Sequence, residues 1–159
     1  MATIDSHIKF DGVDGESAHK DHKGEIPVLQ WTWGVTNASS PIGGGSGRGK
    51  AAPQDFTFMH TLDKASPVLA KSCASGKHFA TVVLTCRKSG EGQKDHLKIT
   101  MKEVFITSVM PSATQGGDIL EAVSCSYKNF EMGYKVQDDK GGTGGEVKMS
   151  WDTATTETS

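Results

Sequence analysis

Apolar side chains recur at every second position through most of this chain, and this alternation limits the folds that it can adopt. Residues 26–36 show it most clearly, because four large apolar side chains share one parity there: Leu29, Trp31, Trp33 and Val35. A period of two is the period of a pleated strand, in which successive side chains point to opposite faces. Burying one indole contributes at most about 4 to 6 kcal/mol, so this face of the strand must lie inside something. We assign it to the core.

Similar alternation, interrupted by glycine-rich turns, marks further strands at residues 7–10, 54–62, 80–86, 97–109, 123–136 and 147–151. In the hairpin formed by residues 80–86 and 97–109, we expect a bend near Glu103. The apolar positions change parity within residues 123–136, and an extra residue near Lys128, forming a bulge, is the simplest cause. The pattern predicts a mainly β protein, an antiparallel β-sandwich or β-barrel.

One segment has a helical period instead. Ser66 can cap a helix, Pro67 suits its first position, and Gly76 suits a left-handed stop. We therefore expect one short α-helix flanking the strands. At 159 residues the chain fits a single domain, residues 1–159, in which the Thr-rich residues 152–159 form a frayed tail. The predicted core includes Trp31, Trp33, Phe56, Phe58 and Leu69.

The charge balance and the cysteines exclude several classes of protein. Lys and Arg number 17 against 19 Asp and Glu, so the net charge of −2 gives no reason to expect binding to nucleic acid or an anionic membrane. The N-terminus lacks a basic segment followed by an apolar one, and no span approaches the roughly 20 apolar residues that cross a bilayer. If the protein leaves the cell, another route carries it. The three cysteines fit a chain folded in a reducing cytosol: Cys73, Cys86 and Cys125.

The stretch GGSGRGKA, residues 44–51, resembles a phosphate-binding loop at first sight. However, Ala51 stands where Ser or Thr would hold magnesium, and a strand pattern follows where the loop would need a helix. We therefore expect no nucleotide and no other cofactor. The loop of residues 37–53 is much longer than the usual two to five residues of a hairpin loop, and such a loop often has a partner.

Catalytic and metal-binding patterns are not found. His19 and His22 are three positions apart, but they lie in a charged loop with no third ligand nearby. No sequence argument brings Cys73 and His78 together as nucleophile and base. Ser46 lacks the glycine that a nucleophile elbow requires two positions later. We predict that the protein is not an enzyme and holds no metal.

Several motifs in a fixed order carry a resemblance to a known family. They are IKFDGVDGES, HKGEIPVLQWTWGV, QDFTFMHTLDKASPVL, CASGKH, VVLTCRKSG, LKITMKEVFITSVMPS, NFEMGYKV and, weakly, MSWD. Together they cover most of the chain and resemble the haemolysin-coregulated protein (Hcp) family, the tube subunits of bacterial type VI secretion. The segments SCSY and AAPQD depart from the family pattern.

The resemblance implies a small β-barrel with a flanking helix that assembles into a homohexameric ring. Stacked rings form a hollow tube, which grows in the bacterial cytoplasm inside a contractile sheath and has a spike at its tip. The family's tube is fired outward with effector proteins in its lumen, so its subunits are secreted without a signal peptide. The resemblance implies a structural protein without catalytic activity.

Two sets of residues are predicted to serve this assembly. The polar face of residues 26–36 is small enough to line a water-filled lumen and to contact cargo, and it comprises Gln30, Thr32, Gly34 and Thr36. The ring-stacking arm is placed on the glycine-rich loop: Gly43, Gly44, Gly45, Ser46, Gly47, Arg48, Gly49 and Lys50. The alternative from a different class is a monomeric β-barrel that binds a small ligand in its interior.

Overall fold

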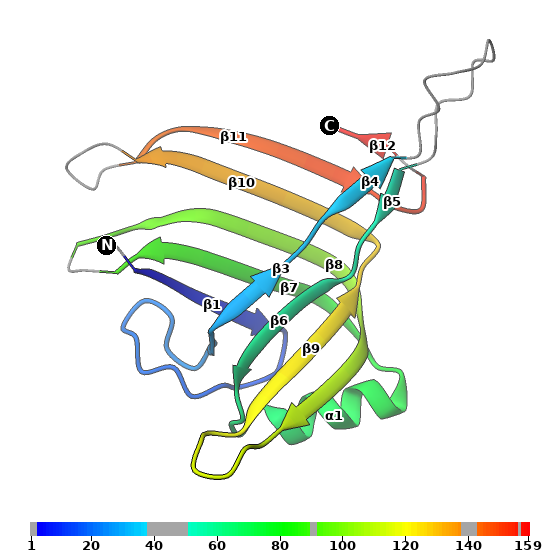
Figure 1. The fold of residues 1–159 in the computed structure, drawn as a ribbon. Coiled ribbons are helices and arrows are strands. Elements are labelled where there is room, and N and C mark those ends of the chain that lie inside the picture. Colours follow the sequence, from blue (N-terminus) through cyan, green and yellow to red (C-terminus); the bar gives the residue numbers. More distant parts are fainter. Residues whose placement is uncertain (1–2, 38–50, 90–91, 138–142, 156) are drawn as a thin grey trace.

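The computed structural model describes residues 3–37, 51–89, 92–137, 143–155 and 157–159, and Figure 1 shows their arrangement. Antiparallel strands dominate it, as the alternating pattern predicts. The strands are β1 (Ile4–Phe10), β2 (Ile26–Val28), β3 (Gln30–Thr32), β4 (Val35–Asn37), β5 (Ala51–Pro53), β6 (Phe56–Thr61), β7 (His78–Lys88), β8 (Asp95–Ser112), β9 (Leu120–Ser126), β10 (Asn129–Gln137), β11 (Thr143–Asp152) and β12 (Glu157–Thr158), and the helix is α1 (Ser66–Ser75).

The strands form two layers that share β8. The larger sheet has the order β12-β11-β10-β8-β7-β1-β2, and the smaller sheet consists of β3, β6, β9 and the C-terminal half of β8. The smaller sheet crosses obliquely in front of the larger one in Figure 1. Side chains from the facing sides of the two sheets fill the space between them, as in other two-layer β proteins.

The predicted bend near Glu103 is the corner at which β8 passes between the sheets. Residues 97–102 of β8 pair with β10, whereas residues 105–112 pair with β9. Glu103 has a φ of 52°, a left-handed conformation that non-glycine residues seldom adopt. This one residue redirects the strand without interrupting it.

The segment of residues 26–36 shows why the expected barrel does not form. We predicted one strand over residues 26–36, but the chain changes partner at Leu29: β2 pairs with β1, and β3 pairs with β6. No ladder joins the outer edge of β2 to that of β3, so the path of paired strands stays open at both. The barrel part of the prediction is wrong, and the arrangement is that of an open two-layer β-sandwich.

Two details of the C-terminal quarter also differ from expectation. The parity change near Lys128 comes from a connection between two strands rather than from a bulge within one, because β9 ends at Ser126 and β10 begins at Asn129. Lys128 N–H donates to Lys102 C=O across this connection at 3.1 Å. Within the expected frayed tail, Glu157 and Thr158 instead pair with β11 as β12.

The core between the sheets is mostly aromatic and aliphatic. Phe10 meets Phe79 edge to face at 5.2 Å between ring centroids and lies 5.9 Å from Phe58. Each fully buried phenylalanine contributes about 1.5 to 3 kcal/mol to folding. The largest fully buried side chains are Phe10, Phe56, Phe58, Phe79, Phe130, Ile8, Ile26, Leu69, Leu84, Ile99, Met101 and Ile106.

The predicted helix is confirmed, and its end signals are largely those that the sequence suggested. Ala65 is the N-cap residue, one position before the expected Ser66, and the helix starts with a proline in its first turn. Gly76 ends it in the left-handed conformation, with φ 71°, and its N–H donates to Cys73 C=O. Buried Leu69 anchors the helix to the core. In the part of the chain that the structure describes, no helix is long and apolar enough to span a bilayer.

Candidate functional site

The outer face of the smaller sheet carries two rows of uncharged side chains. Cross-strand pairing aligns one row of hydroxyl side chains over all of its strands: Thr32, Thr57, Ser124 and Ser108. Thr57 Oγ1 and Ser124 Oγ lie 3.0 Å apart in a hydrogen bond. The adjacent row is Gln30, Met59, Ala122 and Met110. We call these two rows the neutral face.

The four residues predicted to line a lumen do not all lie on this face. Gln30 and Thr32 do, and both are exposed. Gly34 lies in the connection between β3 and β4, where its C=O accepts a hydrogen bond from Gln54 N–H at 2.9 Å. Thr36 is opposite Ala52 in the separate β4–β5 ladder. The structure therefore brings only two of the four residues together.

Sequence reasoning missed the neighbouring strands of the neutral face. Thr57 and Ser124 alternate with buried Phe56, Phe58, Val123 and Cys125, which was the available signal. The polar segment SCSY, which departs from the family pattern, also belongs here. Its Ser124 and Ser126 point away from the core, whereas Cys125 is fully buried and Tyr127 is nearly so. A shallow depression of about 60 Å³ lies between β3 and β6 on this side.

The predicted core residues fall into two groups. Phe56, Phe58 and Leu69 are fully buried. Trp31 and Trp33 are half-buried and pack against the rim of the core. Trp33 stacks on Phe130, with ring centroids 4.0 Å apart and planes 10° from parallel, and its indole N–H donates to the Tyr127 hydroxyl.

The predicted ring-stacking residues, Gly43 to Lys50, lie outside the described residues. What the structure describes is the base of this loop. There β4 and β5 pair from Val35 with Pro53 to Asn37 with Ala51. The loop is therefore flanked on both sides by a hydrogen-bonded ladder.

Three histidines gather on the outer side of the larger sheet. His7 of β1 stacks on His22, with centroids 4.7 Å apart and planes 9° from parallel, and His19 lies 5.4 Å from His7. His22 Nδ1 lies 2.7 Å from Glu25 Oε2, and His22 Nε2 lies 3.0 Å from Asp95 Oδ1. Because both ring nitrogens face carboxylates, these contacts favour the protonated ring, which can donate from both nitrogens.

The histidines have opposite pKa shifts. Burial alone would lower the pKa of His22, but the hydrogen bonds to Asp95 and Glu25 outweigh burial and raise it. The pKa of His7 is lowered to about 4. Burial is the largest cause of this shift, and the neighbouring His22 and His19 contribute to it. His7 Nδ1 has no hydrogen-bond partner among the described residues. The environment therefore favours a proton on His22 and disfavours one on its stacked neighbour, His7.

The cysteines do not form a reactive site. Cys125 is fully buried and Cys86 is nearly so, and burial raises the pKa of both thiols. Cys73, on α1, is half-buried. Within the described ranges, no group of three or more His, Cys, Asp or Glu side chains can hold a metal ion.

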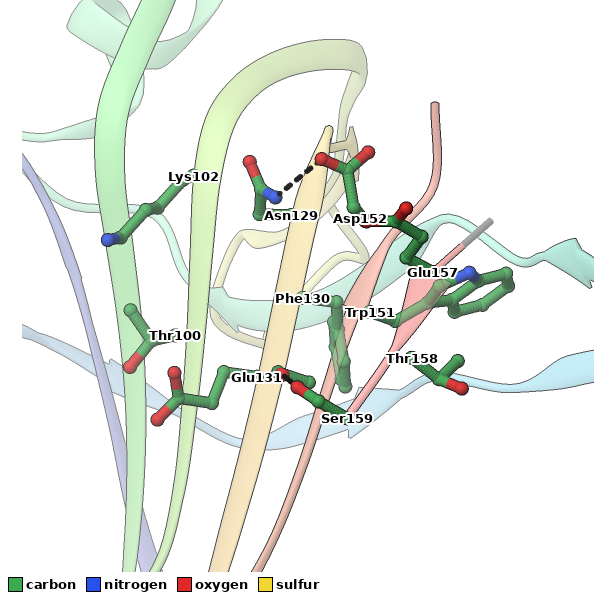
Figure 2. Close-up of a pocket in the computed structure, with 11 residues that line it drawn as sticks. Thr100, Lys102, Asn129, Phe130, Glu131, Trp151, Asp152, Glu157, Thr158 and Ser159 are labelled. Carbon is green, nitrogen blue, oxygen red and sulfur yellow. Dashed lines mark hydrogen bonds between the residues drawn. The ribbon is translucent and has the colours of Figure 1, made fainter. Parts of the chain in front are cut away.

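A pocket of about 550 Å³ lies between β8, β10, β11 and β12 (Figure 2). Asn129 Nδ2 donates to Asp152 Oδ2 at 3.3 Å, the contact drawn between these residues in Figure 2. Lys102 and Glu131 lie on the β8 side of the same pocket. Its described lining residues include neither histidine nor cysteine, so this pocket lacks a nucleophile paired with an imidazole base.

Comparison with known proteins gives consistent matches along the chain. The sequence model of a family described as "Type VI secretion system effector, Hcp" matches residues 7–134. A Pseudomonas aeruginosa protein named "Protein hcp1" is 41% identical over 152 residues, which are 93% of this chain and 94% of that protein.

Solved structures match over nearly the full chain. The crystal structure of Hcp1 from Salmonella typhimurium has a TM-score of 0.83 and 35% identity, and the match covers 100% of both chains. A structure titled "Structure of a type six secretion system protein" has a TM-score of 0.92 and 29% identity, covering 99% of this chain and 100% of that one.

Proposed function

This chain belongs to the Hcp family of type VI secretion proteins, and from that premise we propose that it is the subunit of the secretion tube. Six copies close a ring, the rings stack into a tube, and effector proteins travel in the lumen. The family is one of secreted tube proteins rather than a known enzyme family. The whole chain acts as one domain in this role, is held in the bacterial cytoplasm before export, and contacts a sheath outside and a spike at the tip.

The neutral face is the observation that carries this proposal. A tube lumen must admit different proteins without trapping them, and a wall of uncharged side chains, one row of which is short hydroxyl groups, meets that need. Such a wall offers hydrogen bonds to a passing protein, but its two rows contain no charge that would hold one sign of cargo. Gln30 and Thr32 face the lumen in this arrangement, and Thr57 and Ser124 extend the same wall.

The long loop supplies ring stacking in this proposal. Residues 43–50 contain five glycines among eight positions, with Arg48 and Lys50 as their only charged side chains. The β4–β5 ladder fixes the point from which this segment reaches an adjacent ring. Its contact with that ring must offset the entropy of ordering a glycine-rich chain.

The alternative, a monomer with a ligand inside its barrel, has less support. Such a protein needs an interior cavity. Here the space between the sheets is occupied by five fully buried phenylalanines: Phe10, Phe56, Phe58, Phe79 and Phe130.

Electron microscopy and light scattering test the assembly. The purified protein at micromolar concentration is expected to elute as a hexamer and to appear as annular particles in negative stain. A monodisperse monomer under these conditions would overturn the proposed function.

Cargo binding is tested separately with Thr32→Gln. The longer side chain projects from the neutral face, so rings should persist while an effector co-expressed with the protein is retained less. Thr100→Gln is the matched control, because Thr100 belongs to β8 in the larger sheet, where it pairs with Val83 and Glu131. Equal retention by both variants would refute the placement of the lumen.

A further inference from the structure

The β10–β11 hairpin continues beyond the core that it helps to form. Phe130 and Trp151 are 1% and 4% exposed where the hairpin lies over the core. Farther out on the same face, Tyr134 is paired with Val147, and they are 46% and 69% exposed. Val136, of the same parity, is 53% exposed. We call Tyr134, Val136 and Val147 the overhang.

The opposite face of the same hairpin carries charged side chains, which favour contact with water. Lys148 Nζ lies 3.9 Å from Glu131 Oε1 and 3.7 Å from Glu146 Oε2. Gly133 leaves room for these side chains, because a Cβ at that position would lie only 2.6 Å from Glu146 Oε1. The hairpin thus has a charged face and an apolar face, although both are exposed in a single copy. That pattern is typical of a strand pair with one covered side.

The described elements of the same chain cover little of the overhang: His96 of β8 meets the Tyr134 ring edge to face, with centroids 6.0 Å apart, and Tyr134 is still 46% exposed. Figure 1 shows β10 and β11 extending past the strands of the smaller sheet. Beside β10, Leu97 of β8 pairs with Tyr134 and is only half-buried. Among the described residues, the outer edge of β11 is covered only from Ser150 to Asp152, where β12 pairs with Trp151 and Asp152 and Ser159 exchanges two backbone hydrogen bonds with Ser150. An apolar face next to an open strand edge invites aggregation unless a partner covers it permanently.

A second copy of this chain is the occupant that fits. The overhang continues the core-facing side of its own sheet, so it resembles a domain core cut in half, as obligate subunit interfaces do. A tyrosine flanked by aliphatic side chains is typical of the centre of such an interface. A second copy of the chain is the one partner that is always present together with this protein. The open edge of β11 must be covered at all times to avoid aggregation.

The contact is heterologous if the copies close a ring. We propose that the overhang of each copy seats on a different surface of the next copy and forms the apolar centre of the contact between neighbours in the ring. This inference rests on the proposed tube function and specifies which side of the subunit makes the lateral contact. It leaves the neutral face free, since the overhang lies on the larger sheet.

The test uses two double variants that introduce the same residues on opposite faces of one hairpin. Tyr134→Gln with Val147→Gln removes the apolar overhang, and Lys135→Gln with Lys148→Gln is the control. We expect the overhang variant to raise the concentration at which rings dissociate by more than tenfold in native mass spectrometry, while circular dichroism shows a folded protein. The control should dissociate as the unmodified protein does.

The outcomes separate this inference from the proposed function. If the unmodified protein forms rings and the overhang variant forms them equally well, the inference is overturned while the tube function stands. If the unmodified protein is a monomer, the tube function is overturned, and so is the proposed contact between the overhang and the next copy. A dimer that the overhang variant abolishes would support contact between copies but would overturn the ring geometry.

A labelling experiment covers the case in which the overhang variant does not fold. In a Cys73→Ser background, Val147→Cys should react with a maleimide at least tenfold more slowly at ring-forming concentration than after dilution. Lys148→Cys, on the charged face, should react at similar rates in both conditions. Equal protection at the two positions, or none at Val147→Cys in intact rings, contradicts the inference.

Discussion

The acid sensitivity of the fold should depend on His7 and fall when this ring is replaced by phenylalanine. His7 is 6% exposed and stacks on His22, whose ring nitrogens contact the carboxylates of Glu25 and Asp95. A phenyl ring fills a similar volume and can keep the stack, with a cation–π contact to His22 when that ring is protonated. His7→Phe therefore removes a titrating group with little change in packing.

The magnitude follows from the pKa of His7, which is about 4 in the fold against the 6.5 of an ordinary histidine side chain. Because the folded value is depressed, the unfolded chain binds the proton first as the pH falls. The contribution of neutral His7 is complete above pH 6.5 and is lost progressively down to about pH 4. A difference of about 2.5 pKa units corresponds to about 3 kcal/mol. Asp5 and Asp95 oppose this shift, and burial outweighs them.

His22 has the opposite linkage. Its pKa is raised in the fold, so its contribution is complete below pH 6.5 and is lost as the pH rises through the folded value. In the His7→Phe variant this contribution remains, and the loss of stability between pH 6.5 and 4 should shrink by about 3 kcal/mol.

Urea unfolding at several pH values between 7 and 4, followed by far-ultraviolet circular dichroism at one protein concentration, measures the difference. A fixed concentration matters because subunit association adds to the apparent stability. His78→Phe is the control, since His78 is exposed at the start of β7 and lies outside the histidine cluster. If His7→Phe and the unmodified protein lose the same stability within about 1 kcal/mol, His7 is not the acid-sensitive group.

Three further changes test other parts of the structure. Glu103→Gly should be more stable than Glu103→Val by about 2 kcal/mol in urea unfolding, because the φ of 52° suits glycine and strains a β-branched residue; equal stabilities would contradict the left-handed corner. Gly15→Ala should cost about 1 to 3 kcal/mol, since its Cβ would lie 2.5 Å from Glu25 O, whereas Gly145→Ala, which meets nothing within 4 Å, should cost less than about 1 kcal/mol. Deleting residues 43–49 should leave single rings intact and shorten the stacks seen by electron microscopy; loss of the rings themselves would place this loop in the lateral contact.

Local rules predicted the elements better than the way in which the elements meet. The helix was recognisable because Pro67 and Gly76 mark its two ends through backbone chemistry that does not depend on the rest of the fold. Alternation likewise identified the strand runs. It could not show that residues 26–36 change sheets at Leu29, because an alternating run looks the same whether its two halves share a partner or not.

The candidate surfaces depended still more on long-range pairing. Thr32 was recognisable as the polar side of an apolar strand, but its neighbours on the neutral face come from β6 and β9 through ladders that no local pattern specifies. Val147 and Trp151 have the same parity and similar apolar character, yet one is 69% exposed and the other 4%. What distinguishes them is where the smaller sheet stops, which is a property of the packed molecule.

The shared strand β8 gives the two layers a mechanical connection. Its 18 residues bond to β7 and β10 at one end and to β9 at the other, with an unbroken backbone through Glu103. A force that pushes on one sheet is therefore transmitted to the other along peptide bonds, and not only through side chains that can slip. Shearing the layers apart would first require ladder hydrogen bonds on one side of Glu103 to break, so a subunit of this kind should resist being pushed out of shape from one end.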